Sequence, residues 1–321
     1  TVLGRAGIYN NGTGVRSRVH YGNAYVNAFW DGTQMTYGDG AGNNAPLVEL
    51  DVAGHEMSHG VTENTAGLAY TGDAGGLNES TSDIFGTSVE WFANNPSDVP
   101  DYLIGELINL NGNGTPLRYM DKPHYSSGPL NHWFYLASEG SGAKTINGVS
   151  YNSPTCDAST VTPVGRDKAE KIWYRTLSTY LTSSSTYADT RDASIASAKD
   201  LYATDPGVCS GIAAAFSAIA VPPGAGHVGD DLADHGQVGD RGVAEPHRTP
   251  GGRRLQGREH LVGDARTGRR GGGGLRGRAH RGQQSGEGVG REGAAARSAT
   301  LARYRRRAVG VHNDPVVEAG D

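Results

Sequence analysis

The chain has 321 residues, which is enough for two lobes of ordinary size. Its net charge of −5 is too small to indicate a polyanion-binding protein, and no apolar run is long enough to cross a membrane. The small net charge of the whole chain conceals two parts of opposite net charge. Residues 1–221 carry 12 basic and 22 acidic residues, whereas residues 222–321 carry 17 arginines, no lysine and 12 acidic residues.

The first fifty residues have the composition of strands and turns. Segment 19–30 is rich in Val, Tyr, Phe and Trp with partial alternation, which predicts a strand. Asp31-Gly32 predicts a tight hairpin turn after it. Helical patterns then follow, and an order of strands before helices is typical of an α+β fold. We predict helices near residues 50–64, 78–94, 124–138, 166–182, 190–203 and 207–219.

The composition changes again after Val221. Residues 222–321 contain one aromatic residue, Tyr304, and an arginine–glycine run at 269–278. A segment this poor in large apolar side chains cannot offset its ordering entropy, so we predict a disordered tail. Arginine–glycine segments also occur in nucleic-acid-binding modules, and out-of-frame reading of GC-rich DNA gives a similar composition. We do not expect nucleic acid to be a partner.

The most informative motif is His55-Glu56-Met-Ser-His59, which lies within a predicted helix. Histidines four residues apart share one helical face, where two ring nitrogens can reach one metal ion. Glu56 is placed to act as general base for a metal-activated water. Glu79 can supply a third ligand, and three protein ligands leave a tetrahedral zinc ion one open position, as in catalytic sites.

Three further residues support this interpretation over a chance match to a short motif. Asp83 lies four residues after Glu79, on the same helical face, and can accept the free ring N–H of a histidine ligand. Gly54 and Gly60 flank the histidines inside a helix, where glycine costs about 1 kcal/mol relative to alanine. We therefore expect another segment to pack closely there.

Several segments together resemble the thermolysin-type zinc metalloendopeptidases secreted by actinobacteria. They are residues 27–30 (Asn-Ala-Phe-Trp), 51–59, 65–70, 76–86, 117–118 and 124–128, within a match of about 10–221. The resemblance implies a thermolysin-like fold: a partial N-terminal β-rich lobe with the zinc-binding helix over residues 1–64 and a mainly α-helical lobe over 65–221. The tail predicted from composition follows over 222–321. It implies a secreted, monomeric enzyme that acts on polypeptides, with no membrane partner.

The resemblance also implies roles for individual residues. Tyr70 and His124 would donate hydrogen bonds to the oxyanion of the reaction intermediate. Asn27 and the backbone carbonyl of Ala28 would hold the substrate in an extended form. Arg118 would bind a substrate carbonyl on the leaving side. The positions that line the primary specificity pocket are all apolar, which implies cleavage on the amino side of bulky apolar residues; they are Val52, Ile104 and Leu117.

A second set of acidic residues matches a calcium site of the family. Acids from one neighbourhood repel each other unless a cation lies among them, and ligands that are all oxygen suit calcium. We expect at least one calcium ion, with the backbone carbonyl of Leu103 as a further ligand. The predicted carboxylate ligands are Asp51, Glu90, Asp101 and Glu106.

The two cysteines, Cys156 and Cys209, do not form a CxxC motif. In a cytosolic protein they would be separate thiols, whereas in a secreted protein one disulfide is the simplest interpretation. The resemblance to a secreted family makes them disulfide candidates.

The sequence leaves three alternatives to an active endopeptidase. A zinc aminopeptidase has one residue fewer between the second histidine and the third ligand, and its amine-binding acidic motif is not found here. A catalytically impaired zinc- or peptide-binding remnant is suggested by the short segment before the zinc helix. It is also suggested by Tyr119, which replaces an aspartate that orients His124 in relatives, with Asp121 as a possible substitute. A nucleic-acid-binding module depends on the tail alone.

Overall fold

The computed structural model describes residues 2–110, 112–122 and 127–225. All of these residues belong to one of the two compact units of the chain. The predictions for His124 and for a disordered tail after residue 225 lie outside the described residues.

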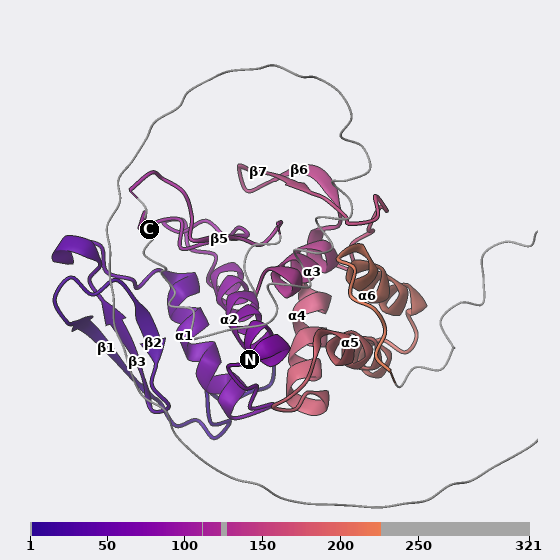
Figure 1. Ribbon diagram of the computed structural model, residues 1–321, viewed down its shortest axis with the longest axis horizontal. Helices are drawn as coiled ribbons and strands as arrows, with labels where there is room; N and C mark the ends of the chain where they lie inside the picture. Colours follow the sequence, from indigo (N-terminus) through magenta and orange to yellow (C-terminus); the bar gives the residue numbers. More distant parts are fainter. Residues whose placement is uncertain (1, 111, 123–126, 226–321) are drawn as a thin grey trace, which may run out of the picture. The chain divides into compact units, whose positions relative to one another are not determined.

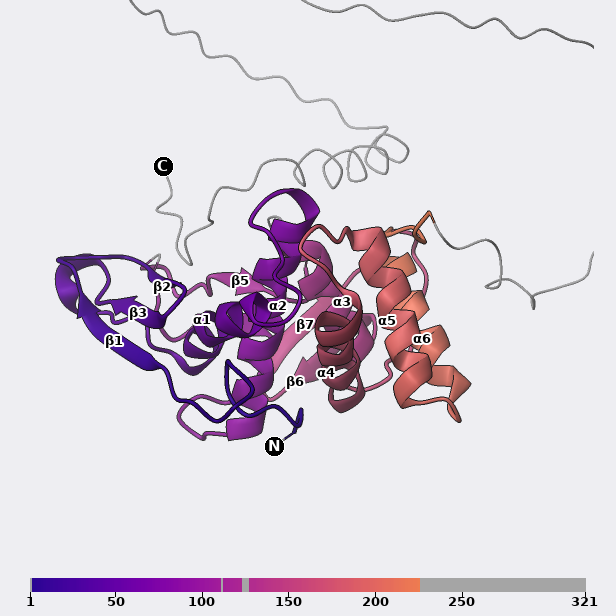
Figure 2. The same ribbon diagram turned by 90° about the horizontal axis from the view of Figure 1, so that it is seen from below.

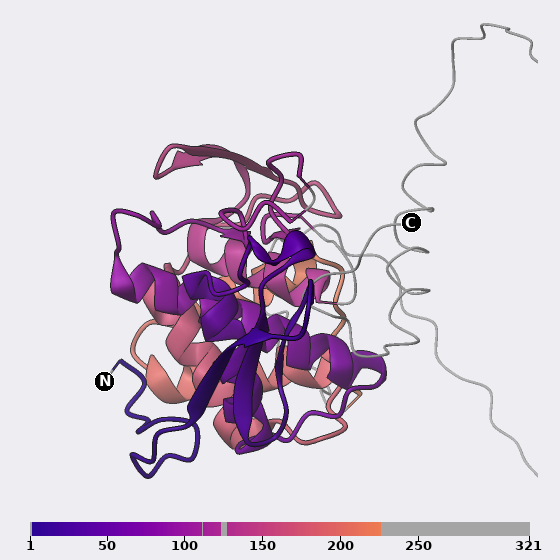
Figure 3. The same cartoon turned by 90° about the vertical axis from the view of Figure 1, so that its left-hand side faces the viewer.

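A three-stranded sheet precedes the first long helix. It contains β1 (Arg16–Tyr21), β2 (Ala28–Trp30) and β3 (Gln34–Gly38) in the order β1-β3-β2, with β1 parallel and β2 antiparallel to β3. The predicted turn lies between β2 and β3, where the Asp31 side chain accepts hydrogen bonds from the backbone N–H groups of Thr33 and Gln34. Figure 3 views the molecule from the side of this sheet, with the helices behind it. The hairpin prediction is therefore confirmed.

Two long helices, α1 (Leu50–Glu63) and α2 (Gly72–Ala93), form the centre of the fold (Figure 1). They approach so closely that a Cβ atom on Gly86 would lie 2.4 Å from the Asp51 carbonyl oxygen, and one on Gly54 would lie 2.9 Å from the Gly86 Cα. Glycine is required here because any side chain would separate the two helices. The expected close packing at Gly54 is confirmed.

Replacement of Gly86 by alanine is expected to destabilise the protein. The new methyl group overlaps the backbone of α1 rather than the end of a flexible side chain, so we expect a loss of about 1–3 kcal/mol in the free energy of unfolding. Chemical denaturation measures the loss. Gly14→Ala is the matched control, since a Cβ atom there meets nothing within 4 Å. Equal stability of the two variants would contradict the proposed close contact.

The remaining helices pack behind α2 and enclose the larger core (Figure 2). Trp133 of α3 stacks on Phe216 of α6 with a ring-centroid distance of 4.8 Å, and Trp173 of α4 lies 5.7 Å from Trp133. These rings are fully buried, so they anchor three helices to one another. The elements are α3 (Gly128–Glu139), α4 (Arg166–Arg175), the π-helical turn η2 (Thr176–Tyr180), α5 (Tyr187–Leu201) and α6 (Pro206–Ala218). None of the described helices is long and apolar enough to cross a membrane.

Short irregular elements connect these helices. A 3-10 turn, η1 (Ala41–Asn43), lies between β3 and α1. The pair β4 (Leu103–Ile104) and β5 (Arg118–Tyr119) follows α2. The hairpin of β6 (Gly142–Ile146) and β7 (Val149–Ser153) follows α3.

The structure contradicts the predicted disulfide. Cys156 and Cys209 are both free thiols. The Cys156 backbone N–H donates a hydrogen bond of 2.7 Å to the carbonyl of Ala218, at the C-terminal end of α6. Cys209 lies nine positions earlier in the same helix, which is about 14 Å along its axis. Bridged cysteines have Cα atoms within about 7 Å, so the fold keeps these two apart.

Candidate metal centre

Two crossing helices bring the three predicted zinc ligands together. His55 and His59 are one turn apart on α1, and Glu79 projects from α2, which crosses it. The His55 Nε2 and His59 Nε2 atoms are 3.0 Å apart, and they lie 3.5 and 3.8 Å from the carboxylate oxygens of Glu79. All three residues are buried, so their approach is imposed by the crossing of the two helices.

Hydrogen bonds to the other ring nitrogens decide which tautomers are present. His55 Nδ1 donates to the Asp83 carboxylate at 2.7 Å, and His59 Nδ1 donates to the Asn78 side-chain oxygen at 2.8 Å. The Asn78 atom that faces His59 is the side-chain oxygen, because the side-chain nitrogen of Asn78 donates a hydrogen bond to the Leu68 carbonyl. In neutral rings, both Nε2 atoms then present lone pairs toward each other, which is the arrangement that a shared cation stabilises.

The separation of these atoms also suits zinc. Zinc–nitrogen bonds of about 2.0–2.1 Å at a tetrahedral angle hold two nitrogens roughly 3.3 Å apart. Two imidazoles and one carboxylate form the ligand set of a catalytic zinc ion. The residues present therefore fit zinc.

Asp83 is the centre of the network that supports His55. Its side chain is fully buried and accepts hydrogen bonds from Arg118 Nε and Nη2, at 2.8 and 2.6 Å, and from Asn131 Nδ2 at 2.7 Å. Burial opposes its ionisation, but the Arg118 and His55 partners outweigh burial and hold the Asp83 pKa below its usual range. The predicted contact between Asp83 and a ligand histidine is thus present in the structure.

The electrostatic environment favours positive charge at the ligand group. Burial alone lowers the pKa of a histidine, yet hydrogen bonds to Asp83 and Glu79 raise the pKa of His55 to about 10. Burial and the nearby His55 lower the pKa of His59. One imidazolium ring or one metal cation compensates the negative charge of the surrounding carboxylates, whereas two imidazolium rings would repel each other.

Glu56 lies on α1 between the two histidines and is 1% exposed. Its Oε1 atom is buried and has no hydrogen-bond partner among the described residues. Burial, with a contribution from Glu79, outweighs the attraction of His55 and raises the Glu56 pKa to about 7. A carboxylate with a pKa near neutrality is suited to accept and return a proton.

A cavity of about 340 Å³ lies beside His59. Its walls include Tyr70, whose hydroxyl oxygen is 3.2 Å from His59 Nδ1, and Trp30, whose Nε1 donates to Glu63 at 2.7 Å. Asn27 and Ala28 lie on the adjoining edge of the sheet, with the Asn27 side-chain oxygen buried and unpartnered. The structure thus brings Tyr70 to the ligand group, while His124 lies outside the described residues.

Two of the three predicted pocket residues, Ile104 and Leu117, are neighbours at the β4–β5 pair. The Leu117 backbone N–H donates to the Ile104 carbonyl at 2.7 Å, and Leu117 packs against the core cluster that contains Val52. Val52 and Ile104 are fully buried, whereas Leu117 is partly exposed. Leu117 is therefore the one of the three that a ligand could reach directly.

Acidic residues from the last turn of α2 and from the segment after it form a compact group. One carboxylate oxygen from each of Glu90, Asp101 and Glu106 lies within 4.8 Å of the others. Both oxygens of Glu90 are buried without a partner, and burial with repulsion from Glu106 raises its pKa to about 10. Asp51 lies beside this group, with its oxygens accepting hydrogen bonds from the Gly105 and Val52 N–H groups at 2.7 and 2.6 Å.

The site also contains supporting residues that were not predicted from the sequence. Asn78 and Asn131 orient His59 and Asp83, and Glu49 and Asp98 form another acidic group with Glu106. Asn78 adjoins Glu79, so helical position alone could have indicated it. Asn131 is 48 residues from its partner, and only the tertiary structure brings it there.

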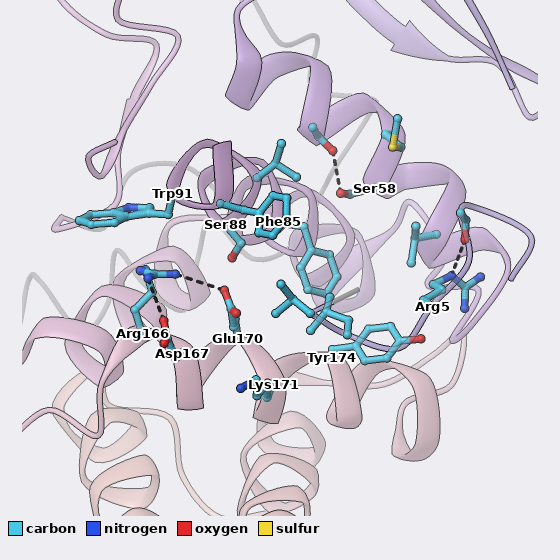
Figure 4. A pocket seen from close by; sticks show the side chains of 18 of the residues that line it. Arg5, Ser58, Phe85, Ser88, Trp91, Arg166, Asp167, Glu170, Lys171 and Tyr174 are labelled. Atoms are coloured by element: carbon cyan, nitrogen blue, oxygen red, sulfur yellow. Dashed lines mark hydrogen bonds and ion pairs between the residues drawn. The ribbon is translucent and has the colours of Figure 1, made fainter. Parts of the chain in front are cut away.

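A separate cavity of about 780 Å³ lies on another face of α1 (Figure 4). Ser58 of α1, Phe85 and Trp91 of α2, and Glu170 and Tyr174 of α4 are among its walls. None of the three metal ligands lines it. This cavity is therefore distinct from the ligand group.

Comparison with known families decides the relationship of the chain. Residues 1–63 match the thermolysin metallopeptidase catalytic domain, and residues 66–123 and 124–221 match the alpha-helical domain of thermolysin metallopeptidases. The chain belongs to the thermolysin family. The resemblance inferred from the sequence motifs is confirmed, and so is the thermolysin-like fold with a β-rich N-terminal part and an α-helical part.

Individual members of the thermolysin family are similar over the same part of the chain. The transglutaminase-activating metalloprotease of Streptomyces mobaraensis is 54% identical over 243 residues, covering 69% of this chain and 32% of that protein. The thermolysin of Alicyclobacillus acidocaldarius subsp. acidocaldarius is 40% identical over 245 residues, covering 68% of this chain and 42% of that protein. This chain therefore spans less than half the length of these relatives.

A solved structure shows the same similarity. The precursor of protealysin, a metalloproteinase from Serratia proteamaculans, aligns with a TM-score of 0.53 and 29% sequence identity. The alignment covers 69% of this chain and 73% of the protealysin precursor.

Proposed function

We propose that this chain is a zinc-dependent endopeptidase that hydrolyses internal peptide bonds. The observation that carries the proposal is the convergence of two imidazole Nε2 atoms and the Glu79 carboxylate beside the unpartnered oxygen of Glu56. Zinc, when bound, supplies Lewis acidity and lowers the pKa of its water toward neutrality.

The side chains around the ligand group carry out the proton transfers. Glu56 accepts the proton of the attacking water and passes it to the departing amine. Tyr70, and by family resemblance His124, donate hydrogen bonds to the developing oxyanion. No side chain acts as nucleophile, so no covalent acyl-enzyme forms.

The substrate is proposed to lie along the edge of β2. Asn27 and the Ala28 carbonyl hold its backbone, and Arg118 binds a carbonyl on the leaving side while remaining bonded to Asp83. Val52, Ile104 and Leu117 form an apolar pocket that favours cleavage on the amino side of bulky apolar residues.

A structural calcium ion is proposed at Glu90, Asp101 and Glu106, with Asp51 and the Leu103 carbonyl beside them. The support is the buried, unpartnered carboxylate of Glu90 and the ligand chemistry, which is all oxygen. From the family resemblance we also propose that the enzyme is secreted and monomeric.

Cleavage of a denatured protein tests this function. We expect the purified chain to cut casein, to lose this activity when a chelator removes zinc, and to regain it on addition of one equivalent of zinc. Mass spectrometry of the fragments should show bulky apolar residues at the new N-termini. A chain that holds zinc but cleaves nothing would instead support the alternative of a zinc- or peptide-binding remnant.

A further inference from the structure

The cavity beside His59 has two acidic walls that the proposed zinc chemistry does not use. Its volume is about 340 Å³, and its walls include two aromatic side chains, Trp30 and Tyr70, and two carboxylates, Asp31 and Glu63. No lysine or arginine of the described residues is among these walls. Neither of the two carboxylates was predicted as a site residue from the sequence.

Asp31 is held in the turn between β2 and β3, where its carboxylate keeps its charge. The side-chain hydroxyl and the backbone N–H of Thr33 donate hydrogen bonds to Asp31 Oδ1 at 2.7 and 2.9 Å, and Gln34 Nε2 donates to Oδ2 at 3.0 Å. These hydrogen bonds, with the one from the Thr33 side chain foremost, lower the Asp31 pKa to about 2. All of these donors are neutral, so the negative charge of Asp31 is oriented but not compensated.

Glu63 is the last residue of α1 and lies one helical turn after His59, on the same face of the helix. Its Oε2 atom accepts a hydrogen bond from Trp30 Nε1 at 2.7 Å, which joins the carboxylate to the indole ring. Among the described residues, neither Glu63 nor Asp31 forms an ion pair with a basic side chain. The cavity therefore contains two carboxylates whose charge is not compensated.

Aromatic walls and carboxylates together suit an organic cation. A guanidinium or ammonium group is attracted by the carboxylates and also by the face of an aromatic ring, most strongly by that of tryptophan. An anionic side chain would be repelled in the same place. A cavity of about 340 Å³ is at the lower end of the range of ligand pockets, so it suits one side chain rather than a whole peptide.

The position of the cavity decides which substrate side chain can enter it. Arg118, proposed to bind the leaving side of the substrate, is joined to the ligand group through Asp83 and His55. The cavity lies instead beside His59, and neither Arg118 nor any of the three proposed pocket residues is among its walls. Trp30 ends β2, the strand along which the substrate is proposed to lie. The cavity thus faces the part of the substrate that precedes the cut bond.

We propose that Asp31 and Glu63, with the Trp30 ring, select a lysine or arginine side chain within the two residues before the cut bond. This inference rests on the proposed endopeptidase function and adds a second determinant to it. The apolar pocket selects the residue after the bond, and the acidic cavity selects a cation before it. The preferred substrates are therefore peptides in which a basic residue shortly precedes a bulky apolar one.

A pair of matched peptides tests this proposal. One peptide carries two arginines directly before a phenylalanine, and the other carries citrulline, the uncharged analogue of arginine, at both positions. We expect the wild type to cleave both before phenylalanine, with a kcat/KM about tenfold higher for the arginine peptide, as for one ion pair and one cation–π contact at a partly exposed site. The difference should shrink at high salt, which screens the carboxylates.

The Asp31→Asn/Glu63→Gln double variant should lower this ratio of kcat/KM values to about one. The ratio within each protein is the readout, because a general loss of activity affects both peptides equally. Asp157→Asn is the matched control and should keep the wild-type ratio, since this aspartate is exposed and is not a wall of the cavity. If the double variant does not fold, Glu63→Gln alone leaves the β2–β3 turn unchanged and should lower the ratio to about three.

Peptide binding distinguishes a failure of this inference from a failure of the proposed function. The zinc-loaded Glu56→Gln protein should bind the arginine peptide about tenfold more tightly than the citrulline peptide in fluorescence anisotropy. That preference without any wild-type cleavage would support the cation site and contradict the endopeptidase function. Cleavage of both peptides at equal kcat/KM, an unchanged ratio in the folded double variant, or equal binding of the two peptides would overturn the cation site.

Discussion

Glu56→Gln is expected to abolish peptide-bond cleavage while zinc remains bound. The amide has nearly the same shape as the carboxylate, so the ligand geometry of His55, His59 and Glu79 is retained. It cannot accept a proton, however, and general base catalysis contributes about a hundredfold to ten-thousandfold to the rate. The wild-type Glu56 has a pKa of about 7 in its buried position, which suits it to this task near neutral pH.

Casein cleavage measured beside zinc content checks this expectation. Asp167→Asn serves as the control, since its side chain is largely exposed and does not contact the ligand group. Wild-type cleavage by a zinc-loaded Glu56→Gln protein would show that another group takes the proton.

Asp83→Asn is expected to weaken both zinc binding and the fold. The wild-type carboxylate accepts four hydrogen bonds, from His55, Arg118 and Asn131. An amide nitrogen in its place would face at least one of these donors, and the Arg118 charge would lose its partner in a buried site. We expect zinc affinity to fall by about 10–100-fold, as when outer-shell partners of ligand histidines are removed.

The same substitution should lower the free energy of unfolding by about 3–5 kcal/mol, because it leaves a buried charge uncompensated. Competition with a chromophoric chelator measures the zinc affinity, and chemical denaturation measures the stability. Asp157→Asn is the matched control, because this aspartate is exposed. Unchanged zinc affinity in Asp83→Asn would contradict the proposed support of His55.

The helices were predictable from the sequence to the extent that one face of each is apolar. The predicted helix 50–64 corresponds to α1, and 207–219 corresponds to α6. The predicted start at residue 78 lies six residues after the observed start of α2, because Gly72, Gly75 and Gly76 weaken the helical pattern. Ala74 and Leu77 are nevertheless buried against the core. Tertiary packing outweighs the low propensity of glycine there.

One hairpin could have been predicted but was not. Asn147-Gly148 joins β6 to β7, and both residues have the positive φ angles, 47° and 91°, of a type I′ turn. The flanking strands are five residues each and contain Ser, Lys and Asn, so composition alone did not indicate them.

The metal ligands were predictable because helical periodicity fixes the spacing of His55 and His59, and of Glu79 and Asp83. Each pair is one turn apart on one helix, so local geometry sets its direction. Asn131, Glu49 and Asp98 were not predictable, because each reaches its partners only when distant segments fold together. Their positions follow from the crossing of α1 and α2 and from the path of the chain between α2 and β4.

X-ray absorption spectroscopy of the zinc-loaded chain tests the central claim most directly. We predict one zinc ion per chain with two imidazole nitrogens and carboxylate and water oxygens at about 2.0–2.2 Å, and no sulfur. Glu79→Gln should reduce the zinc content. A zinc environment with fewer than two imidazoles, or full zinc loading after removal of both His55 and His59, would contradict the proposed catalytic centre.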